Sequence, residues 1–378
     1  MELQVGGQTI VIQGFHSIEQ KLDDAYRAFY LGFYSDRDYS NLINKHLPDI
    51  SKAIIDYFLR TQNKEIIQQE IINNFTCVWN ELRRTYPLWA AKGFWEEILK
   101  LIYKWETARC ERIHKGAVYF YWGGTAIDNG EIDEGFFLMH AAYEEDRITY
   151  QSKTPNSSAY KFVSFDYEGR QYFSGYSQIY AEFVNNFLIP YRLEAISNLT
   201  LTEFREKFLE VINDSSIVFA FTYTVAKLRK LQSISLFVPR SSFASHYGLN
   251  LLFDLVLIID AALKEKIPQR YYADLIGDLA SRDKKHRLSI LGNDLKNEIN
   301  SSARIDFDKT IYDLLNQNYL LKSGKRLSRL ECDIAITYCI RNHGAHNVYS
   351  SNVVWLMFST VQQSFFNVLF FVVDVLYR

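Results

Sequence analysis

The chain has 378 residues, 48% of them hydrophobic and 23% charged, which is typical of a globular protein with two or three domains and excludes a disordered or collagen-like chain. Aromatic residues reach 16%, but only 6 Pro and 17 Gly accompany them, so an all-β sandwich or barrel with many tight turns is disfavoured. The net charge of −2 argues against a strongly basic nucleic-acid binder, although it leaves room for a local basic face.

The cysteines and the N-terminal segment bear on the cellular compartment. The four cysteines show no CxxC or CxxH spacing, so we expect neither a disulfide framework nor a zinc ribbon. The first residues, MELQVGGQTIVIQGF, lack the basic and apolar regions of a signal peptide. No stretch reaches about 18 uninterrupted apolar residues, because Asn367 and Asp374 interrupt the most apolar segment. We therefore expect a cytoplasmic protein that has no membrane partner.

Residues 1–150 are predicted to form an N-terminal helical region. Between residues 17 and 110, apolar side chains recur with the spacing of successive amphipathic helices. Pro48 and Pro87 interrupt the pattern, and a helix is expected to end at Pro87 before another begins. The sequence predicts an array of helices here.

Residues 112–146 contain two helical patterns on either side of Gly130, which favours the left-handed conformation that ends a helix. Gly123, Gly135 and Ala142 alternate with bulky residues, so two antiparallel helices are able to approach closely. The spacing resembles one tetratricopeptide-type (TPR-like) helical hairpin, and only one copy is present. We expect a single helical hairpin rather than a solenoid.

Residues 151–240 are predicted to be an aromatic-rich connecting region followed by helices. The stretch from 151 to 160 is polar and indicates a loop, and residues 161–173 alternate in a way that favours a short β-hairpin or an ordered aromatic loop. Helical patterning resumes at Thr202, a residue type common at helix N-termini. A domain junction is expected within this region.

Residues 241–378 are predicted to form a separate helical bundle. A helical stripe covers about 245–264, a second helix about 327–340, and a closing apolar helix about 351–377. Between them, residues 279–329 carry 11 basic and 6 acidic side chains. The basic excess of the chain is therefore local and lies in its C-terminal part.

A cluster of polar groups follows the apolar helix that ends near Ile340. Arg341, Asn342, His343 and His346 place a cation, an amide and two imidazoles within six residues. In a regular helix Arg341 and His346 point about 140° apart. They meet at one substrate only if the backbone deviates, as a glycine at 344 permits, or if two copies of the chain share a cleft.

The order arginine, polar residue, three variable residues, histidine, followed by a terminal apolar helix, resembles the HEPN domains, which are all-helical modules named for higher eukaryotes and prokaryotes nucleotide binding. Arg341, Asn342 and His346 match the specified positions of the ribonuclease members. The resemblance covers residues 241–378. It implies metal-independent cleavage of single-stranded RNA at a composite site in a homodimer, with no cofactor and no metal.

The residue types suit the implied reaction. A histidine titrates near neutrality, so His346 is expected to take the proton of a ribose 2′-hydroxyl or to donate one to the leaving oxygen. An arginine donates to phosphate oxygens and stabilises their extra charge in the transition state, which is the role expected for Arg341. Asn342 is expected to orient these groups. His343 is either a second imidazole of the site or a variable-position residue facing solvent.

Further candidates surround the motif. Asp254 or Asp260 on the first helix of the bundle is expected to orient Arg341 or a histidine, or to be a surface charge. Two basic runs are expected either to contact RNA phosphates or to form a solvated face. The RNA-binding candidates from these runs are Arg282, Lys284, Lys285, Arg287, Lys325 and Arg326.

Other polar residues, and the motif itself, also allow simpler interpretations. His140 with Glu144 and Glu145 has the spacing of a metal pair but lacks a third ligand nearby, so a solvated or hairpin-interface histidine is favoured. An arginine and a histidine near a helix C-terminus also occur as a simple cap, since cations there complement the helix dipole.

The sequence thus predicts an all-α protein: an N-terminal helical array with a TPR-like hairpin, and a C-terminal HEPN-like helical bundle. We expect an endoribonuclease, acting as an effector or toxin in prokaryotic antiviral defence or stress. Its partners would be RNA, a second copy bound through the C-terminal bundle, and a protein or small-molecule regulator at the N-terminal region. The alternative is a non-catalytic interaction protein whose bundle binds a nucleotide or a protein.

Overall fold

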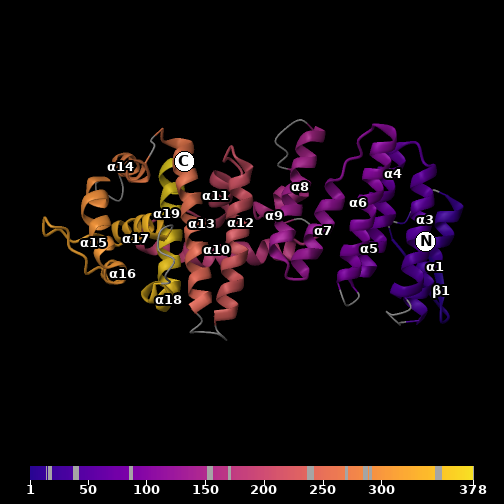
Figure 1. The fold of residues 1–378 in the computed structure, drawn as a ribbon, viewed down its shortest axis with the longest axis horizontal. Helices are drawn as coiled ribbons and strands as arrows, with labels where there is room; N and C mark the ends of the chain where they lie inside the picture. The colour runs from indigo at the N-terminus through magenta and orange to yellow at the C-terminus, as the bar shows by residue number, and fades with distance from the viewer. Residues whose placement is uncertain are drawn as a thin grey trace. The chain divides into compact units, whose positions relative to one another are not determined.

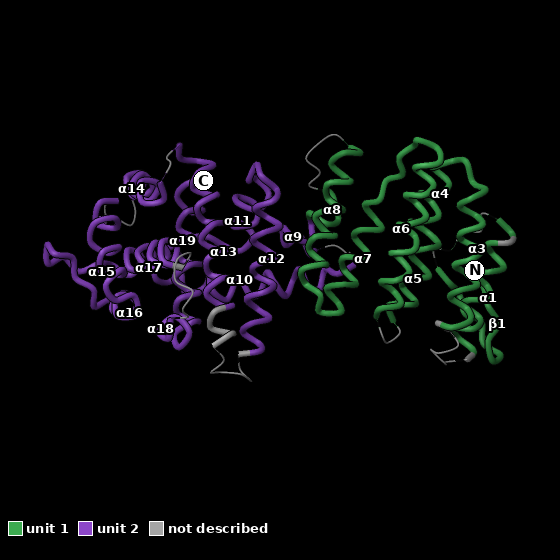
Figure 2. Tube along the Cα trace, in the orientation of Figure 1, with its two compact units in different colours: residues 1–160 green, residues 161–378 purple. Residues whose placement is uncertain are grey.

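The computed structural model describes residues 1–13, 15, 19–36, 42–84, 88–150, 156–168, 172–235, 242–268, 271–283, 288, 292–344 and 351–377. Within these ranges the chain is almost entirely helical, and the all-α fold class predicted from the sequence is confirmed (Figure 1). The chain divides into two compact units, Met1–Tyr160 and Lys161–Arg378 (Figure 2).

The N-terminal unit begins with a short antiparallel hairpin of two strands, which the helical expectation for this region missed. Val5 pairs with Gln8 across the turn, and Gly6 and Gly7 have φ angles of 57° and 81°. Two consecutive left-handed residues make a tight turn whose twist matches that of the strands, and glycine adopts this conformation without steric cost. The strands are β1 (Glu2–Val5) and β2 (Gln8–Val11).

Helices follow in close succession, each with an apolar face turned into the core of the unit. In the helix over Leu47–Arg60, for example, Ile50, Ile54, Tyr57 and Phe58 are buried at helical spacing. The elements are α1 (Gln20–Asp36), η1 (Leu42–His46), α3 (Leu47–Arg60), α4 (Lys64–Glu70), η2 (Ile71–Phe75), α5 (Thr76–Arg83), α6 (Trp89–Arg109), α7 (Gly116–Asp128) and α8 (Ile132–Tyr150).

Helices α7 and α8 form an antiparallel hairpin around Gly130, whose φ of 81° ends α7. The two helices meet at glycines: a Cβ atom on Gly123 would lie 2.9 Å from the backbone oxygen of Gly135, and one on Gly135 would lie 2.9 Å from the oxygen of Gly123. Such distances are too short for a carbon contact. The small residues noted in the sequence therefore let the two backbones approach closely.

The division between the units lies in a short helix, α9 (Ser158–Val163), within the region predicted to connect the two parts of the chain. The described part of residues 161–173 completes this helix and then runs without regular structure, so it holds no strand, and the β-hairpin alternative is wrong there. The helices that follow, through residue 235, belong to the C-terminal unit. Helix α10 (Ser174–Glu194) packs on α19 (Phe358–Leu376), and α12 (Ser215–Ser235) packs on α13 (Ser242–Lys266).

The C-terminal unit, Lys161–Arg378, is a bundle of helices. Its elements are α10 (Ser174–Glu194), α11 (Leu201–Phe204), η3 (Arg205–Leu209), α12 (Ser215–Ser235), α13 (Ser242–Lys266), α14 (Tyr272–Arg282), η4 (Asp294–Ile299), α15 (Asn300–Ile305), α16 (Phe307–Leu315), α17 (Arg329–Gly344), α18 (Asn352–Leu356) and α19 (Phe358–Leu376).

Helix α19 is the core of this unit. It is long and apolar enough to cross a membrane by length and composition, but 72% of its apolar window is buried inside the protein. It packs against α10, α13 and α17 (Figure 1). The ring of Phe366 stacks on that of Phe187, with centroids 4.4 Å apart. The burial of its side chains against three helices of the same unit explains its apolar sequence.

Helix α17 carries the polar cluster at its C-terminal end, and its N-terminus is capped. The Glu331 backbone N–H donates to the Ser328 hydroxyl, and the Ser328 N–H donates to the Glu331 carboxylate at 2.7 Å. This reciprocal capping box sets where α17 begins. Because α17 then runs buried between α13, α16 and α19, the position of Arg341 is determined by the bundle.

Candidate functional site: a held arginine at the end of helix α17

Helix α17 extends to Gly344, so Arg341, Asn342 and His343 all lie on regular helical backbone. His346, the third specified residue of the motif, lies outside the described residues. The same holds for three of the basic candidates, Lys284, Lys285 and Arg287. The structure therefore describes the arginine half of the motif.

The Arg341 side chain is held from two sides and keeps 28% of its surface exposed. Its Nη2 donates to the Asp260 carboxylate at 3.3 Å, and its guanidinium carbon lies 5.3 Å from the centre of the Tyr272 ring. Both contacts favour the cation, the first by charge and the second through the ring quadrupole. The Nε atom of Arg341 is buried without a hydrogen-bond acceptor among the described residues.

Asp260 is the carboxylate that reaches the arginine. It lies on α13, is 5% exposed, and also accepts from the Lys264 ammonium at 2.7 Å one turn along the same helix. Its second oxygen, Oδ1, accepts nothing from the part of the chain that the structure describes. Asp254 is exposed and lies near Lys227 instead. Partial burial raises the pKa of Asp254, although the charge of Lys227 opposes the rise.

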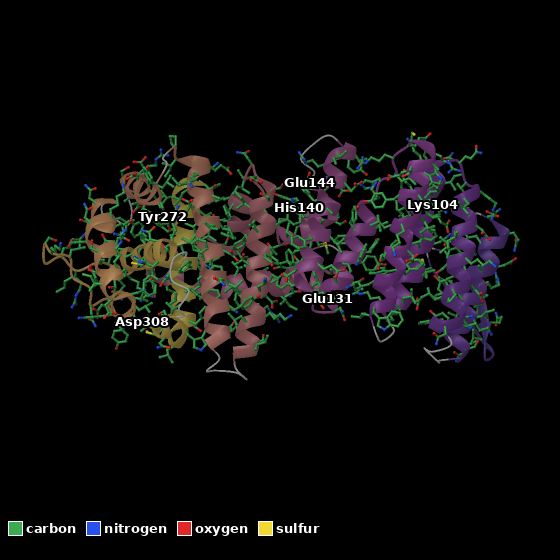
Figure 3. The ribbon with its side chains drawn as sticks, viewed as in Figure 1. Lys104, Glu131, His140, Glu144, Tyr272 and Asp308 are labelled. Carbon is green, nitrogen blue, oxygen red and sulfur yellow. The ribbon has the colours of Figure 1, made fainter. Side chains whose placement is uncertain are left out.

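Tyr272 and its neighbours build a polar wall beside Arg341. Tyr272, labelled in Figure 3, is buried on α14 and shares a hydrogen bond of 3.1 Å with the hydroxyl of Thr337 on α17. Its ring stacks on that of Tyr338, with centroids 6.4 Å apart. Burial raises the pKa of Tyr338, whereas the charges of Lys296 and Arg341 lower it. Two cations, Lys296 and Arg341, therefore act on Tyr338.

Asn342 and His343 point in other directions. The Asn342 amide donates to the side-chain oxygen of Asn300 at 3.5 Å, which is at the outer limit of a hydrogen bond. His343 is 9% exposed, and its ring centre lies 5.8 Å from that of Phe307 on α16. Side chains two residues apart in a helix, such as those of Arg341 and His343, point about 200° apart around the helix axis. His343 is thus on the opposite face of α17 from Arg341 and does not face solvent.

The described basic candidates differ in their surroundings. Arg282, at the end of α14, and Arg326 are exposed. Lys325 donates to the Glu331 carboxylate at 3.2 Å, the same carboxylate that caps α17. The charge of Lys325 is therefore paired with a carboxylate of the same unit.

No cluster of three or more metal-binding side chains is present among the described residues. His140 and Glu144, labelled on α8 in Figure 3, lie 3.9 Å apart. The neighbouring Glu145 points elsewhere and pairs with Arg112 at 2.6 Å. The pair therefore lacks the further ligands that a divalent metal needs.

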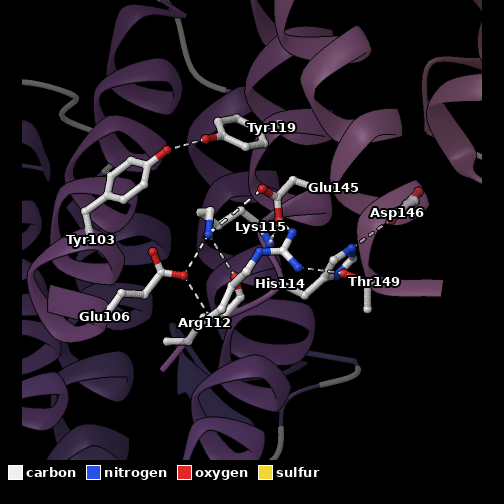
Figure 4. A network of polar contacts seen from close by, with 10 residues as sticks. Tyr103, Glu106, Arg112, His114, Lys115, Tyr119, Glu145, Asp146 and Thr149 are labelled. Carbon is white, nitrogen blue, oxygen red and sulfur yellow. Dashed lines mark hydrogen bonds and ion pairs between the residues drawn. The ribbon is translucent and has the colours of Figure 1, made fainter. Parts of the chain in front are cut away.

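A second polar network lies in the N-terminal unit, between α6, α7 and α8, and the sequence analysis did not predict it (Figure 4). Lys115, which is 4% exposed, donates to Glu106 at 2.7 Å and to the backbone oxygen of Ile113 at 3.0 Å. Beside it, a ring nitrogen of His114 lies 2.8 Å from Asp146. The positive and negative groups of this network pair with one another, and the pair of Lys115 and Glu106 links the α7–α8 hairpin to α6. The network therefore has a structural role.

Comparison with protein-family models, with curated proteins and with solved structures finds no match to this chain.

Of the groups at the arginine, Tyr272 and Lys264 were not predicted from the sequence. The spacing of Asp260 and Lys264, four residues apart on one helix, was an available signal, because such pairs face the same side. Tyr272 offered none, since its approach to Arg341 depends on how α14 folds back onto α17.

Proposed function

We propose that the C-terminal unit cleaves single-stranded RNA by attack of the ribose 2′-hydroxyl on the adjacent phosphate, without a metal ion. The observation that carries the proposal is the guanidinium of Arg341: a permanent cation, fixed by Asp260 and Tyr272, with part of its surface open at the end of the motif helix. The residue order from Arg341 to His346 supports the choice of reaction.

The charge balance around Arg341 favours an anion. Asp260 contributes one negative charge, whereas Arg341 and Lys264 contribute two positive charges in contact with it. A phosphate that approaches Arg341 therefore meets a net positive site. Because the guanidinium is already ordered, little side-chain entropy is lost when it binds, and its donors are in place as charge develops on the phosphate oxygens.

The proposed reaction needs one base and one acid. The 2′-oxygen bonds to phosphorus as its proton passes to a base, and the bond to the 5′-oxygen breaks as that oxygen receives a proton. The products are a 2′,3′-cyclic phosphate and a free 5′-hydroxyl. His346 is assigned the proton transfers, because an imidazole accepts and donates protons near neutral pH. Asn342 is assigned an orienting role.

Two copies of the C-terminal unit are proposed to form the complete site, each supplying one arginine and one histidine to a shared cleft. The N-terminal helical unit would then bind a regulator, and the protein would act as an effector in defence or stress. The alternative is a non-catalytic interaction protein whose C-terminal unit binds a nucleotide or a protein, and it predicts that RNA incubated with the chain stays intact.

The test is incubation of the purified full chain with a fluorescent single-stranded RNA in EDTA. Arg341→Ala and His346→Ala are each expected to lower the cleavage rate by about 100-fold or more, the usual effect of removing a charge-stabilising donor or a general acid–base group. Arg304→Ala removes an exposed cation of the same unit and is the control. The RNA termini are expected to be 2′,3′-cyclic phosphate and 5′-hydroxyl.

Three results would contradict the proposal: an inert wild-type protein that still binds RNA, cleavage that EDTA abolishes, or full activity in both variants. Expression in bacteria provides a second measurement. The wild-type chain is expected to arrest growth and His346→Ala to relieve the arrest at equal protein level.

A further inference from the structure

A cavity of about 340 Å³ lies in the C-terminal unit at the other end of α17. The end of α10 and the residues that follow it form one wall, the first turns of α17 form another, and Asn367 of α19 contributes to the lining. Asp333, which lines it, precedes Arg341 by eight residues, or about 12 Å along the helix. The cavity is therefore separate from the arginine site, and a site of this size takes a small molecule.

Asp333 is completely buried at this cavity. Its Oδ2 accepts from the Asn367 amide at 2.8 Å. Its Oδ1 lies 3.2 Å from Nε of Arg329, but that N–H is not directed at it, and neither atom has a hydrogen-bond partner among the described residues. A buried carboxylate oxygen without a donor is unfavourable unless something else supplies one.

The other charged groups of the lining leave the cavity net negative. Glu194 and Asp333 are carboxylates, and Arg329 is the cation that faces them. Arg329 is engaged elsewhere as well, since its Nη1 donates to the backbone oxygen of Leu315 at 3.0 Å. Burial raises the pKa of Asp333 to about 6, although Arg329, Asn367 and Ser364 oppose the rise. The contacts that the protein makes to Asp333 thus offset only part of the cost of burying its negative charge.

The remaining lining is apolar and includes a left-handed residue at the rim. Ala195, Ile196 and Leu330 line the cavity beside the carboxylates. Ile196 has a φ of 50° and is 80% exposed. This left-handed residue follows the last turn of α10, where the Ser197 N–H donates to the Arg192 backbone oxygen at 3.1 Å, a common way for a helix to end. An exposed isoleucine in this conformation presents an apolar edge to whatever occupies the cavity.

We infer that this cavity binds a small organic cation, a primary amine on a short apolar group. The ammonium would donate to Oδ1 of Asp333 and face Glu194, and the apolar group would lie against Ala195, Ile196 and Leu330. The recognition follows from the net negative charge, the buried acceptor without a donor, and the apolar wall opposite it. The binding is independent of RNA cleavage, since neither Arg341 nor His346 takes part.

The experiment is calorimetric titration of the full chain, without RNA, with three probes of the same shape: phenethylamine, 2-phenylethanol and phenylacetate. The amine is expected to bind one equivalent, and the neutral alcohol at least about tenfold more weakly, because it cannot supply a charged hydrogen bond. Phenylacetate is expected not to bind. Equal binding of the three probes, tighter binding of the anion, or no binding of the amine would overturn the inference.

Variants locate the binding. Glu194→Gln is expected to weaken binding of the amine several-fold, and Asp333→Asn to weaken it by about tenfold or more. Ala195→Trp is expected to abolish amine binding because the larger side chain fills the cavity. Glu182→Gln, an exposed position on the same helix, is the matched control. Arg341→Ala is expected to bind the amine as the wild type does.

Because Asp333 is buried, the fold of the Asp333→Asn variant is checked by circular dichroism. Ala195→Trp and Glu194→Gln, which alter less buried positions, carry the test if that variant unfolds. Amine binding that survives Ala195→Trp would place it elsewhere and overturn the inference. Loss of RNA cleavage with intact amine binding would count against the ribonuclease proposal alone.

Discussion

At the scale of single residues, the arginine site depends on an aromatic ring more than on that ring's hydroxyl group. The face of Tyr272 lies under the Arg341 guanidinium, whereas its hydroxyl is directed to Thr337 inside the core. The Thr337 hydroxyl in turn donates to the backbone oxygen of Ile334 at 2.8 Å, so the tyrosine is the donor of the pair. Ring and hydroxyl are therefore separable by substitution.

Tyr272→Phe is expected to keep the position of Arg341, and Tyr272→Leu to lose it. The phenylalanine retains the ring and costs about 1 kcal/mol of stability for the lost hydrogen bond. The leucine removes the cation–π contact, worth about 1–2 kcal/mol where desolvated, and frees the guanidinium. The measurement is the rate of RNA cleavage, or RNA affinity, at a temperature where both variants are folded. Equal activity of the two variants would show that Asp260 alone positions the arginine.

The buried carboxyl of Glu70 makes stability depend on pH. Glu70 is fully buried, accepts from the Tyr26 hydroxyl at 2.6 Å and from the Asn74 amide, and burial raises its pKa to about 6 from an ordinary 4.5. The folded state therefore holds this proton more tightly than the unfolded chain. Its contribution to stability is complete below about pH 4.5 and is lost as the pH rises through 6.

Glu70→Gln is expected to stabilise the protein at about pH 8 and to change little near pH 4.5. A shift of about 1.5 units corresponds to about 2 kcal/mol, which the neutral glutamine recovers while keeping an acceptor for Tyr26. The measurement is the difference in unfolding midpoint between the variant and the wild type at each pH. The raised pKa of Asp333 also makes stability depend on pH, but it is present in both proteins and cancels in the difference. The control is Glu65→Gln on the exposed face of the same helix. A gain that does not vary with pH would be contrary to this account.

At the scale of elements, the hairpin of α7 and α8 depends on the absence of side chains at its crossing. A Cβ atom on Gly123 would meet the Gly135 oxygen at 2.9 Å, the Leu138 Cβ at 3.0 Å and the Met139 nitrogen at 3.2 Å. Two of these are backbone atoms, which are unable to move without separating the helices. Close approach is thus a property of the pair of helices, and neither one alone requires it.

Gly123→Ala is expected to destabilise the N-terminal unit by about 1–3 kcal/mol, because the added methyl group forces the helices apart. Gly93→Ala in α6 is the matched control: nothing lies within 4 Å of its Cβ position. That substitution is expected to stabilise by about 0.5–1 kcal/mol, the gain of alanine over glycine within a helix. Thermal unfolding measures both. Two shifts of the same sign would refute the crossing argument.

At the scale of the whole molecule, each of the two units has a core of its own. In the C-terminal unit the side chains of α19 supply it, and the helices between residues 174 and 235 cover it together with α13 and α17. The arginine site and the carboxylate cavity both belong to this unit. We therefore expect its folding not to require contacts from residues 1–155.

A fragment of residues 156–378 is expected to fold by itself, with a helical circular dichroism spectrum and one cooperative thermal transition. It starts before α9 so that this helix remains whole. The measurement is circular dichroism on heating, compared with the full chain. A fragment that melts without a transition would mean that the first 155 residues complete its core.

Much of this architecture was accessible from the amino-acid sequence, because it depends on neighbours along the chain. Apolar residues at helical spacing indicated the helices, and the small residues around Gly130 indicated a tight hairpin. The N-terminal strands were missed although the Gly6–Gly7 pair is a local signal for a tight turn. Their short length gave the alternation of strand residues little weight.

The surroundings of the site residues came from the tertiary structure alone. Sequence spacing allowed either Asp254 or Asp260 to reach Arg341, and left His343 with either a site role or solvent exposure. The packing of α13, α14 and α16 around α17 selected Asp260, buried His343 against Phe307, and brought Tyr272 under the guanidinium. Periodicity tells which face of a helix is apolar, but the partner of each polar side chain depends on how distant helices pack.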